Sequence, residues 1–277
     1  MFWADMEVTA AIDIGTNSTR LLVVKKTGAG WEVLTRKLAG TRLGEGIRGG
    51  VLLRSAMERT AEAVGRFYRE ALSLGAQRVV AGATSAVRDA SNQGEFLSLV
   101  KLGTGLPVRV LSGEEEARLT YRGVVSGLPI EPDQTVVVDI GGGSTELIWS
   151  QAGRLHLASV KAGAVRMYGS DGRDKLIEMV GPALEQVRRS QVKSLVGVGG
   201  TITTLAAIDQ GLVDYDPCRV HGYSLTTEKI KQILNMLAAL DLVDRRRVPG
   251  LQPERADIIL VGVRIALAVL EGLDLGR

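Results

Sequence analysis

The sequence is poor in the side chains that form covalent cross-links and soft metal sites. Its 277 residues include one cysteine, Cys218, and two histidines, His156 and His221. A single cysteine excludes an internal disulfide and a cysteine-based zinc site, and two histidines argue against a histidine-rich metal site. We expect His221, alone in a loop at 217–225, to make structural hydrogen bonds rather than to act as a catalyst.

Long apolar runs are also missing, and the first residues do not read as a secretory leader. Residues 1–8, MFWADMEV, have no basic segment followed by an apolar one, so no signal peptide is predicted. The most apolar late stretch, 258–270, contains Arg264 and is shorter than the roughly 20 residues that span a bilayer. The net charge of +3 suits a polyanionic ligand, but basic residues do not alternate with aromatic ones. We therefore expect a cytoplasmic protein without a membrane or nucleic-acid partner.

The most informative stretch is a run of three glycines, 141–143, between strand-like segments at 136–138 and 147–149. It has neither the lysine nor the following helix of a P-loop, and it does not match a dinucleotide fingerprint. A turn without Cβ atoms lets an anion approach successive N–H groups. Asp139 beside it would repel a phosphate unless a cation such as Mg²⁺ lies between them. Taken alone, the stretch is also compatible with an ordinary tight hairpin.

The same pattern occurs a second time. Residues 12–23 read IDIGTNSTRLLV and residues 138–149 read VDIGGGSTELIW. An internal repeat of this kind predicts two related lobes, each beginning with an acid-tipped glycine hairpin. We assign residues 1–126 and 127–277 to the two lobes, because the segment at 126–134 is rich in glycine and proline. If the lobes face each other, two acids and two anion-binding turns line one cleft suited to a metal–polyphosphate ligand.

Arginines provide further candidate anion contacts. Arg88 follows a strand-like run and is expected either to bind a phosphate through its guanidinium or to pair locally with Asp89 or Glu95. Arg166 is a second candidate. The glycine turn at 197–208 predicts a helix N-terminus of the kind that often binds phosphate.

A cluster of acids opens a predicted helix at 112–125, SGEEEARLTYRGVV. Ser112 and Glu115 have the spacing of a capping box, and acids in a first turn also suit the helix dipole. Glu116 is needed for neither role, so we consider it a candidate general base.

Seven motifs together resemble the exopolyphosphatase/guanosine pentaphosphate phosphohydrolase (Ppx/GppA) family. They are IDIGTNSTRLLVV, TRLGEGI, ATSAVRDASN, LSGEEEARLTYRGV, VVVDIGGGSTELI, GVGGTITTLAAI and ERADII, in the order in which the family has them. The resemblance implies an α/β fold with two ribonuclease-H-like lobes, as in the actin, heat-shock-70 and sugar-kinase superfamily, around a central phosphate cleft. The 277 residues resemble the short, two-domain members without a C-terminal helical HD-like domain, so processive action on long polyphosphate is not expected.

By position, the resemblance also assigns roles to individual residues. It implies that Glu116 activates or orients the attacking water, and that Asp139 and Glu146 are catalytic acids associated with Mg²⁺. It implies that Asp13 is a further metal ligand. The phosphate contacts that it implies are Thr16, Asn17, Ser18, Arg88, Gly142, Gly143, Ser144 and Thr145.

The predicted activity is the Mg²⁺-dependent release of terminal orthophosphate from inorganic polyphosphate, short chains included, or the conversion of guanosine pentaphosphate to tetraphosphate. One alternative is an ATP-dependent phosphotransferase of the same superfamily, since fold does not settle function. The SGEEEA segment and the lack of a recognisable adenine pocket count against it. Another alternative is a non-catalytic regulator that binds polyphosphate or guanosine tetraphosphate. The presence of all the candidate catalytic acids argues against it. A homodimer is compatible with the resemblance.

Overall fold

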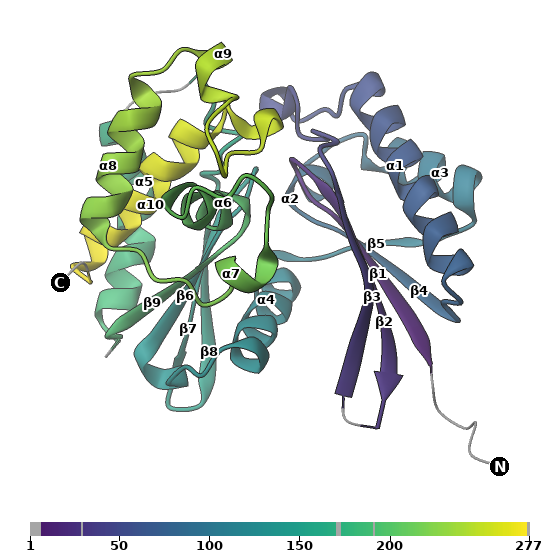
Figure 1. The fold of residues 1–277 in the computed structure, drawn as a ribbon, viewed down its shortest axis with the longest axis horizontal. Coiled ribbons are helices and arrows are strands. Elements are labelled where there is room, and N and C mark those ends of the chain that lie inside the picture. Colours follow the sequence, from purple (N-terminus) through teal and green to yellow (C-terminus); the bar gives the residue numbers. More distant parts are fainter. Residues whose placement is uncertain (1–6, 29, 170–172, 191, 276–277) are drawn as a thin grey trace. The chain divides into compact units, whose positions relative to one another are not determined.

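The computed structural model describes residues 7–28, 30–169, 173–190 and 192–275. The chain divides into two compact units, Met1–Gly113 and Glu114–Arg277, each built around its own β-sheet (Figure 1).

The first unit contains a five-stranded sheet with the strand order β3-β2-β1-β4-β5. Its elements are β1 (Val8–Ile14), β2 (Thr19–Thr27), β3 (Gly30–Ala39), a 3₁₀ turn (Ile47–Gly49), α1 (Arg54–Ser73), β4 (Arg78–Ala83), α2 (Ser85–Arg88), α3 (Gln93–Thr104) and β5 (Val108–Val110). Strand β2 pairs antiparallel with both β1 and β3, whereas β4 pairs in parallel with both β1 and β5.

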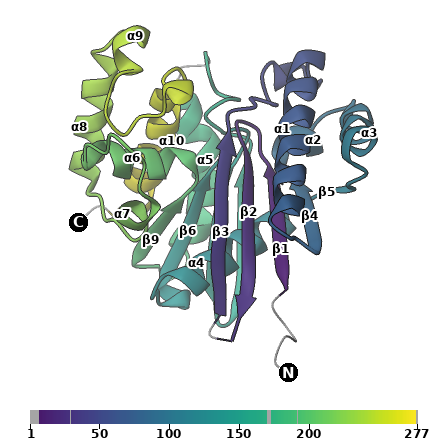
Figure 2. The same ribbon diagram turned by 45° about the vertical axis from the view of Figure 1, so that its right-hand side comes forward.

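Helices α1 and α3 lie against one face of this sheet, as both views of the ribbon show (Figures 1 and 2). Met57 and Val64 of α1 and Phe96 of α3 share a buried core with Ile12 of β1 and Leu21 of β2. Burial of these alternate strand residues is the main force that holds the glycine hairpin of the first unit in place.

Two glycines, Gly103 and Gly105, lie near the end of α3. The helix continues past the first to Thr104 and is capped by Gly105 at φ 71°. That left-handed conformation favours glycine, and the Gly105 N–H donates to Lys101 O in the manner of a helix C-cap. Of two nearby glycines, the one whose backbone is left-handed ends the helix.

The second unit contains a four-stranded sheet with the order β8-β7-β6-β9. Its strands and turns are β6 (Thr135–Ile140), β7 (Thr145–Gln151), β8 (Arg154–Val160), β9 (Ser194–Val198) and two 3₁₀ turns (Pro132–Gln134, Pro253–Arg255). Its helices are α4 (Gly113–Gly127), α5 (Arg173–Arg188), α6 (Gly200–Asp209), α7 (Pro217–Val220), α8 (Thr227–Ala238), α9 (Leu242–Arg245) and α10 (Ile259–Leu273).

Helix α4 belongs with the second sheet rather than the first. Its buried residues Ala117 and Val124 pack on Val137 and Ile148, which lie on β6 and β7. The boundary between the units therefore follows Gly113, one helix earlier than the 126/127 boundary that the glycine- and proline-rich segment suggested. The opposite face of the sheet packs on α5 and α10.

The C-terminal part of the second unit contains one long and two short helices besides α8. Pro253–Arg255 form a 3₁₀ turn, and the long helix α10 begins at Ile259. Short helices α7 and α9 were not predicted, because four residues carry too little periodicity to be distinguished from a loop. Within the described parts of the chain, no helix combines the length and the apolar character needed to cross a membrane.

Candidate active site

The two glycine hairpins have the same backbone geometry in their respective units. Asp13 lies opposite Arg20 in the β1–β2 pair, and Asp139 lies opposite Glu146 in the β6–β7 pair. In both hairpins the first glycine of the turn donates its N–H to the carbonyl of the serine three residues later, at 3.0 Å. The internal repeat predicted from the sequence is therefore a structural duplication. Whether the two turns share a cleft stays a prediction.

The first turn is buried within its own unit. Thr16, Asn17 and Ser18 are all buried, and the TRLGEGI segment folds back onto them. Backbone N–H groups of that segment donate to the Thr16 and Asn17 carbonyls at 2.8 Å. The Asn17 Oδ1 is a buried acceptor that takes no hydrogen bond from the described residues. Because an unsatisfied buried acceptor is costly, a ligand or water at this turn would relieve it.

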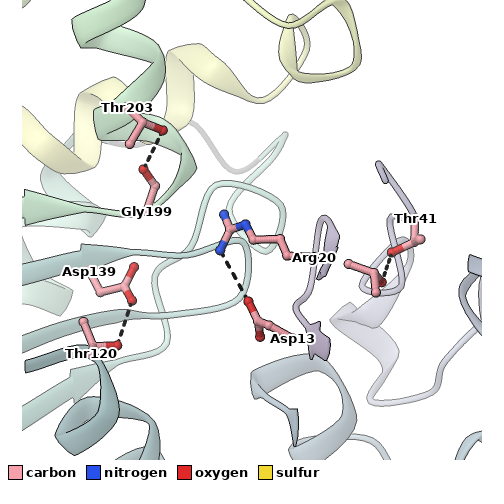
Figure 3. Close-up of polar contacts among 8 residues, drawn as sticks. Asp13, Arg20, Thr41, Thr120, Asp139, Gly199 and Thr203 are labelled. Atoms are coloured by element: carbon pink, nitrogen blue, oxygen red, sulfur yellow. Dashed lines mark hydrogen bonds and ion pairs between the residues drawn. The ribbon is translucent and has the colours of Figure 1, made fainter. Parts of the chain in front are cut away.

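Asp13 is half-buried at the end of β1 and pairs with Arg20, the residue opposite it on β2. Arg20 Nη1 donates to Asp13 Oδ2 at 3.4 Å (Figure 3). Burial raises the pKa of the Asp13 carboxyl, and the charge of Arg20 and its hydrogen bond offset part of that shift. The assignment of Asp13 as a metal ligand stays a prediction.

Arg88 lies at the C-terminal end of α2, where its guanidinium Nη1 donates to the Leu111 carbonyl at 2.9 Å. This contact joins α2 to the segment after β5, so Arg88 has a packing role in the first unit. Its predicted contact with phosphate stays a prediction.

Three of the candidate acids, Glu116, Asp139 and Glu146, belong to the second unit and influence one another electrostatically. Glu146, on β7, has a residue exposure of 2%. Burial, together with the neighbouring charges of Glu116 and Asp139, raises the pKa of its carboxyl to about 8. Hydrogen bonds from Ser144 and Ser159 oppose that shift. Glu116 of α4 is thus within electrostatic reach of the buried acid of the hairpin.

Two hydroxyl groups that the sequence analysis did not identify hold these acids. Thr120 Oγ1 donates to Asp139 Oδ2 at 3.4 Å (Figure 3), and Ser159 Oγ donates to Glu146 Oε1 at 3.0 Å. Thr120 follows Glu116 by four residues, so the two share a helix face, a signal that could have been read. Ser159 lies opposite Glu146 in the β7–β8 register, and residue spacing alone does not show that pairing.

The turn between β9 and α6 also touches the acid cluster. A Cβ atom on Gly199 would lie 2.7 Å from both Asp139 Oδ1 and the Ile140 carbonyl oxygen, and Gly199 has φ 90°. Only glycine fits this position without strain. The Gly199 carbonyl accepts a hydrogen bond from Thr203 Oγ1 at 3.1 Å (Figure 3). The glycine turn predicted at 197–208 is therefore held against Asp139.

The predicted phosphate contacts of the second turn differ in whether their donor groups already have a partner within the protein. The N–H groups of Gly142 and Gly143 meet no acceptor within the described part of the chain, so they remain available to a ligand. Thr145, in contrast, is fully buried and donates its hydroxyl to the Ala162 carbonyl at 2.6 Å. Its side chain therefore braces the turn, and its predicted contact with phosphate has no support from this arrangement.

His221 makes the structural contact expected of it. Its Nε2 lies 2.8 Å from the carbonyl oxygen of Gly127, the last residue of α4. It links the loop after α7 to the end of the helix that carries Glu116.

The predicted magnesium ion stays a prediction, and the chemistry of the acid cluster is compatible with an ion that a bound phosphate also coordinates. Among the described residues, no group of three or more histidine, cysteine, aspartate or glutamate side chains is arranged to hold a metal ion by itself. Mg²⁺ commonly takes only one or two carboxylates from a protein and completes its shell with phosphate and water. After burial, the negative charges of Glu116 and Asp139 are what raises the pKa of Glu146, and a cation would neutralise these charges. Asp139 and Glu146 are the residues that would hold it.

The raised pKa of Glu146 predicts a pH-dependent stability in the absence of divalent cations. The folded state binds the Glu146 proton more tightly than the unfolded state, where the pKa is near 4.5 rather than about 8. This contribution to stability is complete below pH 4.5 and is lost as pH rises toward 8. We expect the free energy of unfolding, measured in EDTA by denaturant titration, to fall by up to about 1.4 kcal/mol per pH unit across this window. In Glu146→Gln the free energy of unfolding is expected to depend less steeply on pH. An equally steep dependence in that variant would contradict the raised pKa of Glu146.

Two mixed α/β units that each contain the same acid-and-glycine hairpin define a protein of the actin-like class. The model of the Ppx/GppA phosphatase family matches residues 22–276. The chain belongs to this family and is a phosphohydrolase. Because family members have the actin-like ATPase fold, the predicted fold class is confirmed.

Individual relatives agree with this assignment. Exopolyphosphatase 2 of Mycobacterium tuberculosis is 34% identical over 275 residues, which cover 90% of this chain and 86% of that protein. The crystal structure of the Aquifex aeolicus Ppx/GppA family member has a TM-score of 0.78 and 31% identity, and the match covers 97% of this chain and 91% of that one. A bifunctional 3-dehydroquinate synthase/phosphatase of Fusobacterium nucleatum is 29% identical over 95% of this chain, which spans only 43% of that longer protein.

Proposed function

We propose that the protein releases terminal orthophosphate from inorganic polyphosphate, short chains included, in a Mg²⁺-dependent reaction. The observation that carries this proposal is the cluster of Glu116, Asp139 and Glu146 beside a glycine turn with unused N–H groups. The name of the M. tuberculosis relative, an exopolyphosphatase, supports polyphosphate as the substrate. Guanosine pentaphosphate is the second candidate substrate, because the family description includes GppA proteins.

In this proposal the residues of the second unit divide the chemistry among them. Glu116 takes a proton from the attacking water, a contribution of typically 10²–10⁴-fold in rate. The N–H groups of the second turn hold the terminal phosphoryl group and stabilise the charge that develops on it. Asp139 and Glu146 hold Mg²⁺, which neutralises phosphate charge when bound.

Within the first unit, the proposal gives the buried turn a binding role. The Asn17 Oδ1 accepts a hydrogen bond from water or from a hydrated ligand, which would satisfy an acceptor that has no partner among the described residues. Positioning and charge neutralisation carry most of phosphoryl-transfer catalysis, so a binding contribution of this kind matters.

A phosphate-release assay tests the proposal and its alternatives. The purified protein is incubated with Mg²⁺ and, separately, with tripolyphosphate, longer polyphosphates of graded length, guanosine pentaphosphate and ATP. We expect orthophosphate from polyphosphate or guanosine pentaphosphate, and its loss when EDTA replaces Mg²⁺. Release that persists in EDTA would contradict the metal requirement. Binding of these compounds without any release would favour a regulator, and consumption of ATP only when an acceptor is added would favour a phosphotransferase.

A further inference from the structure

The segment that follows β8, residues 161–166, packs against the second glycine turn, and we name it the second clamp. Three successive carbonyl groups of the turn accept hydrogen bonds from it. The bonds run from Ala164 N–H to Gly141 O (3.0 Å), from Val165 N–H (2.8 Å) and Arg166 N–H (3.0 Å) to Gly142 O, and from Arg166 Nε to Gly143 O (2.6 Å).

This arrangement determines the direction of the donors in the turn. Each carbonyl shares a planar trans peptide group with the N–H of the next residue, and the two point in opposite directions. Holding the three carbonyls on the side of the clamp turns the N–H groups of Gly142, Gly143 and Ser144 to the other side. Throughout the described ranges, no acceptor takes these N–H groups. The turn is therefore prepared for an anion before any ligand binds.

The first turn has an equivalent clamp made of backbone groups, residues 41–44. The bonds are those from Gly44 N–H to Thr16 O and from Arg42 N–H to Asn17 O. In the repeat, Asn17 corresponds to Gly143. The carbonyl that a main-chain N–H holds in the first unit is thus held by the Arg166 side chain in the second. One donor of the second turn depends on a single replaceable side chain.

We propose that Arg166 is a positioning residue for phosphate binding: by holding the Gly143 carbonyl, it aims the Ser144 N–H at the phosphoryl group of the substrate. The guanidinium also polarises the peptide group whose N–H the substrate uses, because hydrogen bonds in series strengthen one another. This inference deepens the proposed function and rests on it. It gives Arg166 a role distinct from the direct anion contact that the sequence suggested.

Substitution of Arg166 by Ala, Gln and Lys tests the inference through kcat, KM and melting temperature with tripolyphosphate and Mg²⁺. We expect Arg166→Ala to lower kcat/KM by about tenfold or more, since the loss of a single oriented donor has effects of this size. Arg166→Gln should recover part of the loss, because its neutral amide N–H can donate to the same carbonyl. Guanidinium ions added to Arg166→Ala should also recover part of the loss in kcat/KM. Arg189→Ala is the matched control, because that exposed arginine pairs with Glu185 on the surface of α5.

A second measurement does not depend on turnover. In ¹⁵N-labelled protein without substrate, the amide resonance of Ser144 is expected to shift in Arg166→Ala and to remain in place in Arg189→Ala. If Arg166→Ala does not fold, kcat/KM and the Ser144 amide resonance are instead compared between Arg166→Gln and wild type.

Three outcomes would overturn the positioning role. They are equal kcat/KM in Arg166→Ala and wild type, an unmoved Ser144 resonance, and rescue by Lys but not by Gln, which would show that the charge contacts the anion directly. A wild-type protein that releases phosphate from none of the substrates would contradict the proposed function instead. The Ser144 resonance would then still decide whether Arg166 orients this peptide group.

Discussion

Replacing Glu116 by glutamine is expected to remove most phosphate release while the protein stays folded. Glutamine keeps the shape of the side chain but cannot accept the proton of the attacking water, so the loss in kcat should be about 10²- to 10⁴-fold. The substitution also removes one negative charge from beside Glu146, whose pKa that charge helps to raise. The melting temperature measured in EDTA should therefore stay the same or rise. Orthophosphate release and thermal unfolding, measured on the same preparation, check both halves of the prediction.

Glu114→Gln is the matched control for this experiment. Glu114 lies in the same first turn of α4, but its exposed carboxylate pairs with Arg118 at 2.7 Å. An exposed pair of this kind contributes little to stability, and the Glu114 carboxylate is not among the charges that shift the pKa of Glu146. Wild-type turnover in Glu116→Gln, or an equal loss in Glu114→Gln, would contradict the role of Glu116.

Gly163→Ala is expected to damage both stability and activity. A Cβ atom at this position of the second clamp would lie 2.5 Å from the Gly142 carbonyl carbon and oxygen and from the carbonyl carbon of Gly143. These are backbone atoms, so the glycine turn itself has to move. Overpacking of this kind typically costs roughly 1–3 kcal/mol. Displacement of the turn also misdirects its N–H groups, so we expect phosphate release to fall by at least about tenfold.

Gly123→Ala provides the comparison, because Gly123 lies in α4 and a Cβ there would meet no heavy atom within 4 Å. Alanine is favoured over glycine in a helix interior by roughly 0.5–1 kcal/mol, so this variant should be slightly more stable than wild type and equally active. Thermal unfolding and phosphate release separate the two variants. A Gly163→Ala protein with unchanged turnover would show that the clamp does not control the turn.

The fold and the acid cluster were largely predictable, because both are carried by local sequence patterns. The repeated hairpins at 12–23 and 138–149 have the alternation and glycines of two equivalent turns, and the structure gives them the same hydrogen-bonded geometry. Glu116 was separated from Glu115 by its place in the helix, and it does lie close enough to influence Glu146. The resemblance to the family supplied the roles of these residues.

Features that depend on contacts distant in sequence were missed. Ser159 reaches Glu146 through strand pairing, and the clamps hold the turns through backbone groups whose positions no residue type encodes. The assignment of α4 to the second unit likewise depends on the packing of Ala117 and Val124, which the glycine- and proline-rich segment after it does not reveal. Thr145 matched a binding motif but uses its hydroxyl to brace the turn.

Because α4 packs on the second sheet, all three acids of the cluster lie in one unit. The helix that carries Glu116 and the hairpin that carries Asp139 and Glu146 belong to one compact body, 114–277. The spacing among the three acids is therefore an internal property of that body. Substitutions within the first unit are therefore expected to leave the arrangement of these three acids unchanged.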